Sequence, residues 1–275
     1  MKVLISVDLE GISGIVHTAE TNPDRYDYER GRALMTAEAN AVIAGVLDAE
    51  PDAVVWVADA HGTFRNILPE DLDRRAHLVR GKPRPLGMLA GLDEHTDAVL
   101  FVGYHARAGA GPAVLAHTIS DAILDVRVAR RSLGEIGLNV AMAGHLGAPV
   151  VLLSGDDSAC AEFAELVPSA VTVAVKQTLG QAAAVALHPQ EARERLRHAA
   201  AEAIARRASI SPTTMAGPLD VEVDLYGPYM VDLAALVPGV TRVGGGRTVA
   251  FHAADVAEAY RLVQLLVQLA SIKPS

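Results

Sequence analysis

Carboxylates and histidines of the kind that bind metal ions follow three apolar runs in the first half of the chain. These residues are Asp8 and Glu10, then Asp59 and His61, and then His105. Carboxylate oxygens and imidazole nitrogens are common ligands of zinc and similar divalent ions. Two carboxylates that leave one buried strand repel each other unless a cation lies between them. The residue types and their spacing therefore predict a metal centre.

The number of acidic candidates indicates more than one ion. Too many carboxylates gather here for a single structural zinc site, which prefers cysteine and histidine. A bridging carboxylate such as Asp8 could hold two ions about 3.5–4 Å apart, the arrangement that activates water and polarises a carbonyl in aminopeptidases. We therefore predict a two-metal centre with hydrolytic chemistry.

These candidates need secondary structure that brings them together. Residues 3–7, 53–58 and 98–102 are apolar nearly throughout, which is typical of parallel strands covered on both faces. Residues 28–50 have the apolar spacing of a helix, so strands and helices alternate. Ligands of such sheets bind at the carboxyl ends of the strands. The predicted fold is a three-layer α/β/α domain with a mostly parallel central sheet.

The same patterns predict the later elements. They are strands at residues 114–120, 123–128, 149–153, 219–225, 240–243 and 248–252, and helices at residues 135–145, 190–208 and 253–272. Residues 219–225 alternate apolar with acidic side chains, as an edge or half-exposed strand does. The chain therefore ends in a smaller C-terminal α+β portion. We expect residues 1–275 to form a single catalytic unit, with residues 1–185 and 186–275 as candidate lobes.

Composition excludes several classes of function. A net charge of -9 disfavours nucleic-acid partners, because phosphate binding needs clustered lysine and arginine. Cys160 is the only cysteine, which excludes a disulfide framework and indicates a buried, inert thiol on a helix. Asp8 and Glu10 interrupt the apolar N-terminal segment, so we expect no export signal, and no apolar stretch is long enough to predict a membrane span. We expect a cytoplasmic protein.

Residues 6–11, SVDLEG, match the SxDxEG signature of the DppA-type zinc-dependent D-aminopeptidase family of self-compartmentalising peptidases, which the chain resembles over most of its length. Further segments resemble their family counterparts and follow in the same order. They are YERGR at 28–32, DAH at 59–61, GYHAR at 103–107, GEIGLN at 134–139, SGDD at 154–157 and AVKQT at 174–178.

The resemblance implies a site, a substrate and an assembly. The implied ligands of two zinc ions are Asp8, Glu10, His61, His105 and Glu135. His117 would be the catalytic histidine, and Glu135 is assigned by the resemblance alone. The implied substrate is a short peptide with an N-terminal D-amino acid, such as a D-alanine dipeptide. The implied assembly is a homo-oligomer, a decamer of two stacked pentamers whose active sites face an inner chamber.

The role of His117 is open between a nucleophile, as the family assignment has it, and a general base or transition-state stabiliser. We favour assistance, because a water whose pKa a metal lowers to about 7 is already an adequate nucleophile. Asp59 is a candidate for orienting a ligand, and Asn139, Lys176 and Asp156 are weaker candidates for the wall of the site. The remaining histidines are expected to be structural: His17, His77, His95, His145, His188, His198 and His252.

Two alternatives stay open. One is a two-metal amidohydrolase or phosphoesterase of other specificity. Arg107 is the main cation near the ligand motifs, so a phosphate substrate is disfavoured. The other alternative is a non-enzymatic metal-binding protein on the same scaffold, which would have little use for His117.

Overall fold

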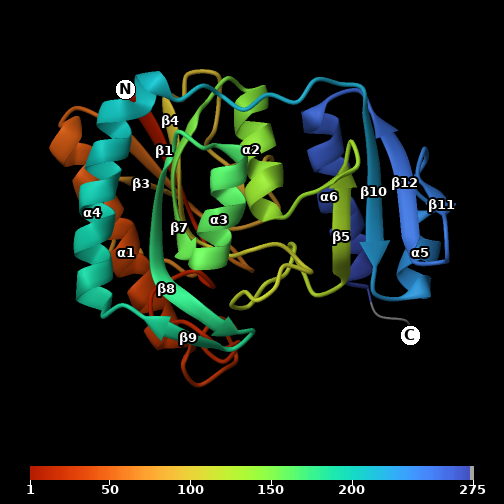
Figure 1. Ribbon diagram of the computed structural model, residues 1–275, viewed down its shortest axis with the longest axis horizontal. Coiled ribbons are helices and arrows are strands. Elements are labelled where there is room, and N and C mark those ends of the chain that lie inside the picture. The colour runs from red at the N-terminus through yellow and green to blue at the C-terminus, as the bar shows by residue number, and fades with distance from the viewer. Residues whose placement is uncertain (273–275) are drawn as a thin grey trace.

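Two β-sheets organise the protein, whose computed structural model describes residues 1–272 (Figure 1). Within these residues the central sheet has seven strands in the order β3-β2-β1-β4-β7-β8-β9. Their bounds are β1 Lys2–Val7, β2 Val54–Asp59, β3 His77–Val79, β4 Ala98–Tyr104, β7 Val150–Asp156, β8 Val171–Gly180 and β9 Ala183–Ala186. All neighbouring strands run parallel except β8 and β9, which confirms the mostly parallel central sheet.

Helices cover both faces of this sheet. The helices α1 (Tyr28–Ala49) and α4 (Pro189–Arg206) pack against each other on one face, and α2 (Glu135–His145) and α3 (Asp157–Leu166) lie on the other (Figure 1). Every residue of β4 is buried between these layers, because a continuously apolar strand has no face to offer to solvent. The three-layer α/β/α arrangement is confirmed.

A second, antiparallel sheet lies beside the first, with strands in the order β11-β12-β10-β5-β6. Their bounds are β5 Ile123–Val128, β6 Arg131–Ser132, β10 Leu219–Leu225, β11 Thr241–Val243 and β12 Thr248–Ala253. The helices α5 (Pro228–Ala234) and α6 (Val256–Ala270) pack on it, and α6 also contacts α2 (Figure 1). The smaller C-terminal α+β portion forms most of this sheet and its helices, and α6 connects it to α2 beside the central sheet.

Strand β10 is half-exposed, as expected for residues 219–225, but it is not an edge strand because it lies between β12 and β5. Its acidic side chains pair across the sheet with Arg127 of β5. The Arg127 guanidinium lies 2.8 Å from Glu222 Oε2 and 2.6 Å from Asp224 Oδ2. Opposite charges on facing strands stabilise their pairing, so the acidic positions mark a paired strand.

The expected boundary between residues 185 and 186 does not separate the two sheets. Strands β5 and β6 come from the middle of the chain yet belong to the second sheet, whereas α4 follows the boundary yet packs against α1. The chain therefore crosses between the two parts more than once, which ties them together covalently as well as by packing.

The strand predicted at residues 114–120 is wrong. This segment is a loop whose Leu115 and Ile119 have φ angles of 50° and 61°, in the left-handed region that a strand never uses. Val114 and Leu115 are buried although they form no ladder, so a short apolar run does not by itself indicate a strand. Separately, within residues 1–272 none of the helices combines the length and the apolar character that a bilayer crossing requires.

Candidate metal centre

The sheet order places three ligand-bearing strand ends side by side. Strand β1 lies between β2 and β4, and its last residue, Val7, pairs with Asp59 on β2 and with Val102 on β4. Asp8 follows directly, and its backbone N–H donates to the Val102 carbonyl at 2.8 Å. The carboxyl ends of the three strands therefore face one crevice, as the positions of their apolar runs predicted.

The loop after β1 is pressed against the end of β4. The Gly11 N–H donates to the Gly103 carbonyl at 2.7 Å. A Cβ atom at Gly11 would lie 2.0 Å from the Tyr104 carbonyl oxygen, so only glycine allows this approach. The contact brings Glu10, on the loop, to the same crevice as His105, which follows β4.

Asp8 presents its two carboxylate oxygens to two different histidines. Oδ1 lies 3.2 Å from His61 Nδ1, and Oδ2 lies 3.5 Å from His105 Nε2. Each histidine also faces a second carboxylate: His61 Nδ1 lies 2.9 Å from Glu10 Oε2. On the other side, His105 Nε2 lies 3.2 Å from Glu135 Oε1. Asp8 thus lies between two carboxylate–histidine pairs, which is where a bridging ligand belongs.

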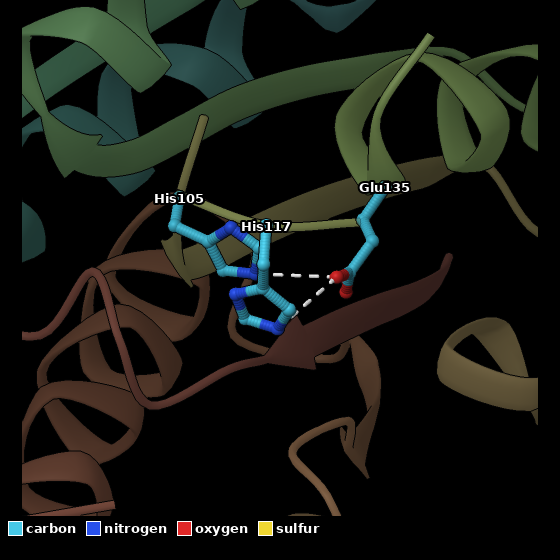
Figure 2. A group of neighbouring side chains, drawn as sticks. All are labelled: His105, His117 and Glu135. Atoms are coloured by element: carbon cyan, nitrogen blue, oxygen red, sulfur yellow. Dashed lines mark ion pairs between the residues drawn. The ribbon is translucent and has the colours of Figure 1, made fainter. Parts of the chain in front are cut away.

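Figure 2 shows the second pair together with His117. Glu135 is the first residue of α2, and its Oε1 accepts a hydrogen bond from the Ile119 N–H at 2.6 Å. The His117 ring stacks on the His105 ring with centroids 4.0 Å apart, and its Nε2 lies 3.7 Å from Glu135 Oε1. Ligand atoms of these three side chains lie within 4.8 Å of one another. The loop at residues 114–120 therefore delivers the predicted catalytic histidine to the centre.

Backbone carbonyls orient all three imidazoles. The pairs are His61 Nε2 with Thr21 O at 2.9 Å, His105 Nδ1 with Ala106 O at 3.0 Å, and His117 Nδ1 with Leu115 O at 2.9 Å. A carbonyl oxygen only accepts, so the ring nitrogen that faces it carries the hydrogen. The other nitrogen of each neutral ring then turns its lone pair toward the carboxylates, as a metal-binding histidine requires.

The environment of His105 tests whether a metal fits. Its Nε2 is buried and has no hydrogen-bond partner within residues 1–272, although buried polar atoms are nearly always paired. The lone pair of this nitrogen faces the carboxylates of Asp8 and Glu135, an arrangement that is repulsive without a cation between them. The donor set is that of zinc or a similar divalent ion, so the residues fit a metal centre.

The pKa values reflect the concentration of negative charge in this buried crevice. Burial, and then the nearby charge of Glu10, raise the pKa of Asp8 to about 7. Burial also opposes ionisation of Glu10, but the attraction of His61 and the neighbouring imidazoles holds its pKa well below the usual value. Burial lowers the pKa of His105, yet Glu135 and Asp8 together raise it to about 10. A bound divalent cation would supply the positive charge that this crevice needs and would displace protons from its ligands.

Lys176 was expected in the wall of the site, but it lies behind the site and contacts the backbone there. Its buried ammonium donates to the backbone carbonyls of Glu10, Ile12 and Ile15 at 2.5, 3.0 and 2.6 Å. Burial lowers the pKa of Lys176 to about 8. Since these three carbonyls belong to the loop after β1, Lys176 fixes the segment from which Glu10 projects.

Asp59 also acts indirectly, as expected of a residue that orients a ligand. Its carboxylate accepts hydrogen bonds from the Asn66 amide at 2.7 Å and from the Ile67 N–H at 2.8 Å. The same Asn66 amide donates to the His61 carbonyl at 2.6 Å. Asp59 therefore holds the backbone of His61 through Asn66 and does not contact its ring.

The other expected wall residues support neighbouring segments. Asp156 caps α3 through the Ala159 N–H, and its other oxygen accepts from the Val114 N–H at 2.7 Å, which anchors the loop that carries His117. Asn139 hydrogen-bonds to Tyr104 and Tyr260 behind the site. The orienting carbonyls of Thr21 and Leu115 had no signal in the sequence, because any residue type supplies a backbone oxygen.

The seven histidines expected to be structural are all exposed, and none belongs to the ligand clusters of the described chain. His17 Nδ1 accepts from the Ala19 N–H and shapes a turn. Cys160 is buried on α3, and burial raises the pKa of its thiol to about 12, which confirms the inert thiol expected there.

The centre lies between two cavities. The larger, of about 760 Å³, is lined by Asp8 and Glu135 and by residues of α6. The smaller, of about 320 Å³, includes Glu10 in its wall. His61 and His117 line both cavities, so a bound molecule could pass across the centre with one end in each.

The strand ends of this parallel sheet bring carboxylates and histidines together at an accessible crevice. This arrangement is typical of metal-dependent hydrolases. Comparison with known proteins narrows the class. The sequence model of a peptidase family described as D-aminopeptidase matches residues 1–265. The chain belongs to this family.

Two relatives agree with this assignment. A D-aminopeptidase from Bacillus subtilis (strain 168) is 37% identical over 272 residues, which cover 98% of each chain. A solved structure, described as the Zn-dependent D-aminopeptidase DppA from Bacillus subtilis, a self-compartmentalizing protease, superposes with a TM-score of 0.96 at 34% identity and covers 100% of both chains.

Proposed function

We propose that this chain is a two-zinc aminopeptidase that removes an N-terminal D-amino acid from short peptides, and that residues 1–275 form one catalytic unit. The observation that carries the two-ion count is the position of Asp8, whose two oxygens face different histidines. The choice of zinc is supported by the donor set and by the Zn-dependent relative. The preference for D-residues is supported by the family and by both relatives.

In this proposal, five side chains hold the two ions. Glu10 and His61 serve one side of Asp8, and His105 and Glu135 serve the other. Zinc supplies a Lewis acid that activates water and polarises the amide carbonyl. The protein fixes the ligand geometry: Lys176 and Asp59 hold the backbone segments of Glu10 and His61, and backbone carbonyls fix the tautomers.

His117 is the proposed catalytic residue. Its Nδ1 is committed to the Leu115 carbonyl, so its Nε2 is free to accept a proton from the attacking water and to donate it to the leaving amine. Glu135 Oε1, 3.7 Å away, stabilises the imidazolium between these two steps. This role requires no covalent acyl-histidine, and we propose general acid–base assistance.

The direct test combines metal analysis with an assay. We expect the purified protein to contain about two zinc ions per chain and to cleave D-alanyl-D-alanine, because a site with this many buried carboxylates needs that much positive charge. A chelator should remove the activity, and zinc should restore it. Atomic absorption and release of D-alanine provide the two measurements.

L-alanyl-L-alanine and p-nitrophenyl phosphate serve as control substrates in this assay. Faster cleavage of the L-dipeptide or of the phosphate ester would replace the proposed substrate by one of the alternatives. Active protein that contains no metal would contradict the centre itself.

We also propose that the protein assembles into a closed homo-oligomer, a decamer. The self-compartmentalizing relative supports assembly, and the β8–β9 hairpin carries exposed apolar side chains, Leu179 and Val185, that are 66% and 58% exposed in the single chain. Light scattering at micromolar concentration should give about ten times the 28.8 kDa mass of one chain. A mass near that of one chain would contradict assembly and leave the metal chemistry intact.

A further inference from the structure

The two cavities that meet at the metal centre differ in the charged residues that line them. The larger has Lys82 and Arg84 in its wall, and its described acidic residues, Asp8 and Glu135, lie at the centre itself. The smaller has no lysine or arginine among its described residues and includes Glu10 and Asp121. We infer that a peptide lies across the centre with its amine in the smaller cavity and its C-terminal carboxylate at Lys82 in the larger one. This inference rests on the proposed function.

Arg84 builds the wall of the larger cavity. Its guanidinium donates to the backbone carbonyls of Asp59, Val79 and Gly87 at 2.6, 3.1 and 2.9 Å. It also lies over the Phe64 ring, 4.1 Å from the centroid. With these groups satisfied, Arg84 supplies a fixed positive charge but few free donors.

Of the two described cations in this wall, Lys82 is the one whose charged group is available to a ligand. Its side chain is exposed, and within residues 1–272 its ammonium has no carboxylate partner. It lies 5.7 Å from the centroid of the same Phe64 ring that Arg84 covers. The Phe64 N–H donates to the His61 carbonyl at 2.7 Å, so the residue whose ring lies beside Lys82 is hydrogen-bonded to the backbone of a proposed metal ligand.

The charge and size of the larger cavity suit the carboxyl-terminal part of a peptide. A carboxylate near Lys82 would gain a charge-assisted hydrogen bond in a field to which Arg84 adds. Gln264 and Gln268 of α6 line the same space and offer amide groups to a peptide backbone. The volume of about 760 Å³ leaves room for one or more residues after the scissile bond.

The smaller cavity suits a single residue with a free amine. The polar residues Thr18, Thr21 and Asn22 line it, and Asp121 supplies a carboxylate outside the proposed ligand set. At about 320 Å³ it is less than half the size of the other cavity. A peptide bound in this direction presents its first amide bond at His117, which explains cleavage of one residue at a time from the amino end.

The experiment compares D-alanyl-D-alanine with D-alanyl-D-alaninamide, which lacks only the terminal negative charge. We expect Lys82→Met to raise KM for the free acid about tenfold and to change KM for the amide less than about twofold. Lys82→Glu should reverse the preference in favour of the amide. Arg80→Met is the matched control, because Arg80 is an exposed cation two residues away and does not line the cavity.

A second variant tests the other end of the peptide. Asp121→Asn should raise KM for the acid and for the amide by the same factor, because both substrates carry the free amine. If Lys82→Met alters both substrates alike, or neither, the inference is overturned. If the wild-type enzyme cleaves neither substrate, the proposed function fails first, and the two failures are thereby distinguished.

Discussion

Replacing His117 by alanine should lower kcat on D-alanyl-D-alanine by about three orders of magnitude while the protein keeps its zinc. The reason is geometric. In the proposed centre Asp8, Glu10, His61, His105 and Glu135 are the ligands, whereas His117 lines both cavities and has only its Nδ1 held by the Leu115 carbonyl, which leaves Nε2 to move a proton. Steady-state kinetics and metal analysis of the same sample measure the two quantities.

His95→Ala is the control for this variant. His95 is an exposed histidine that precedes β4, whereas His105 follows β4, and it belongs to no ligand cluster of the described residues, so its replacement should leave kcat and zinc unchanged. Loss of zinc from His117→Ala would make His117 a ligand, a role that its 4.8 Å grouping with His105 and Glu135 also allows. Retention of normal turnover would remove His117 from the mechanism.

Much of the candidate metal centre could be predicted from the residues that follow the apolar runs. Asp8, Glu10, His61 and His105 each follow a buried apolar strand, and neighbouring parallel strands must end at the same edge. Local sequence therefore fixed both the element and the direction in which the chain emerges from it. These four residues converge in the structure at distances of 2.9–3.5 Å.

The positions of Glu135 and of the loop that carries His117 could not be predicted in this way. Glu135 begins a helix on the far side of the sheet, after two strands of the other sheet, so its position depends on the path of the whole chain. Only the family resemblance pointed to it. The 114–120 loop was mistaken for a strand because burial of Val114 and Leu115 comes from packing, not from a ladder.

The membership of β5 in the second sheet did have a signal. Residues 124–128 alternate apolar and charged side chains, as residues 219–225 do, whereas β4 of the central sheet is apolar throughout. Two half-exposed patterns belong together in one antiparallel sheet. The charges also match, since Arg127 pairs with Glu222 and Asp224.

The Asp8→Ala variant should lose both of the proposed zinc ions and at least about a thousandfold in kcat, because Asp8 turns one carboxylate oxygen to His61 and the other to His105. Glu135→Gln should lose only the ion beside His105, since the pair of Glu10 with His61 is intact. Metal analysis of both proteins, with circular dichroism to verify folding, makes the comparison. If Asp8→Ala kept one zinc, Asp8 would be a terminal ligand and not a bridge. Equal zinc loss in the two variants would instead mean that the ions bind only as a pair.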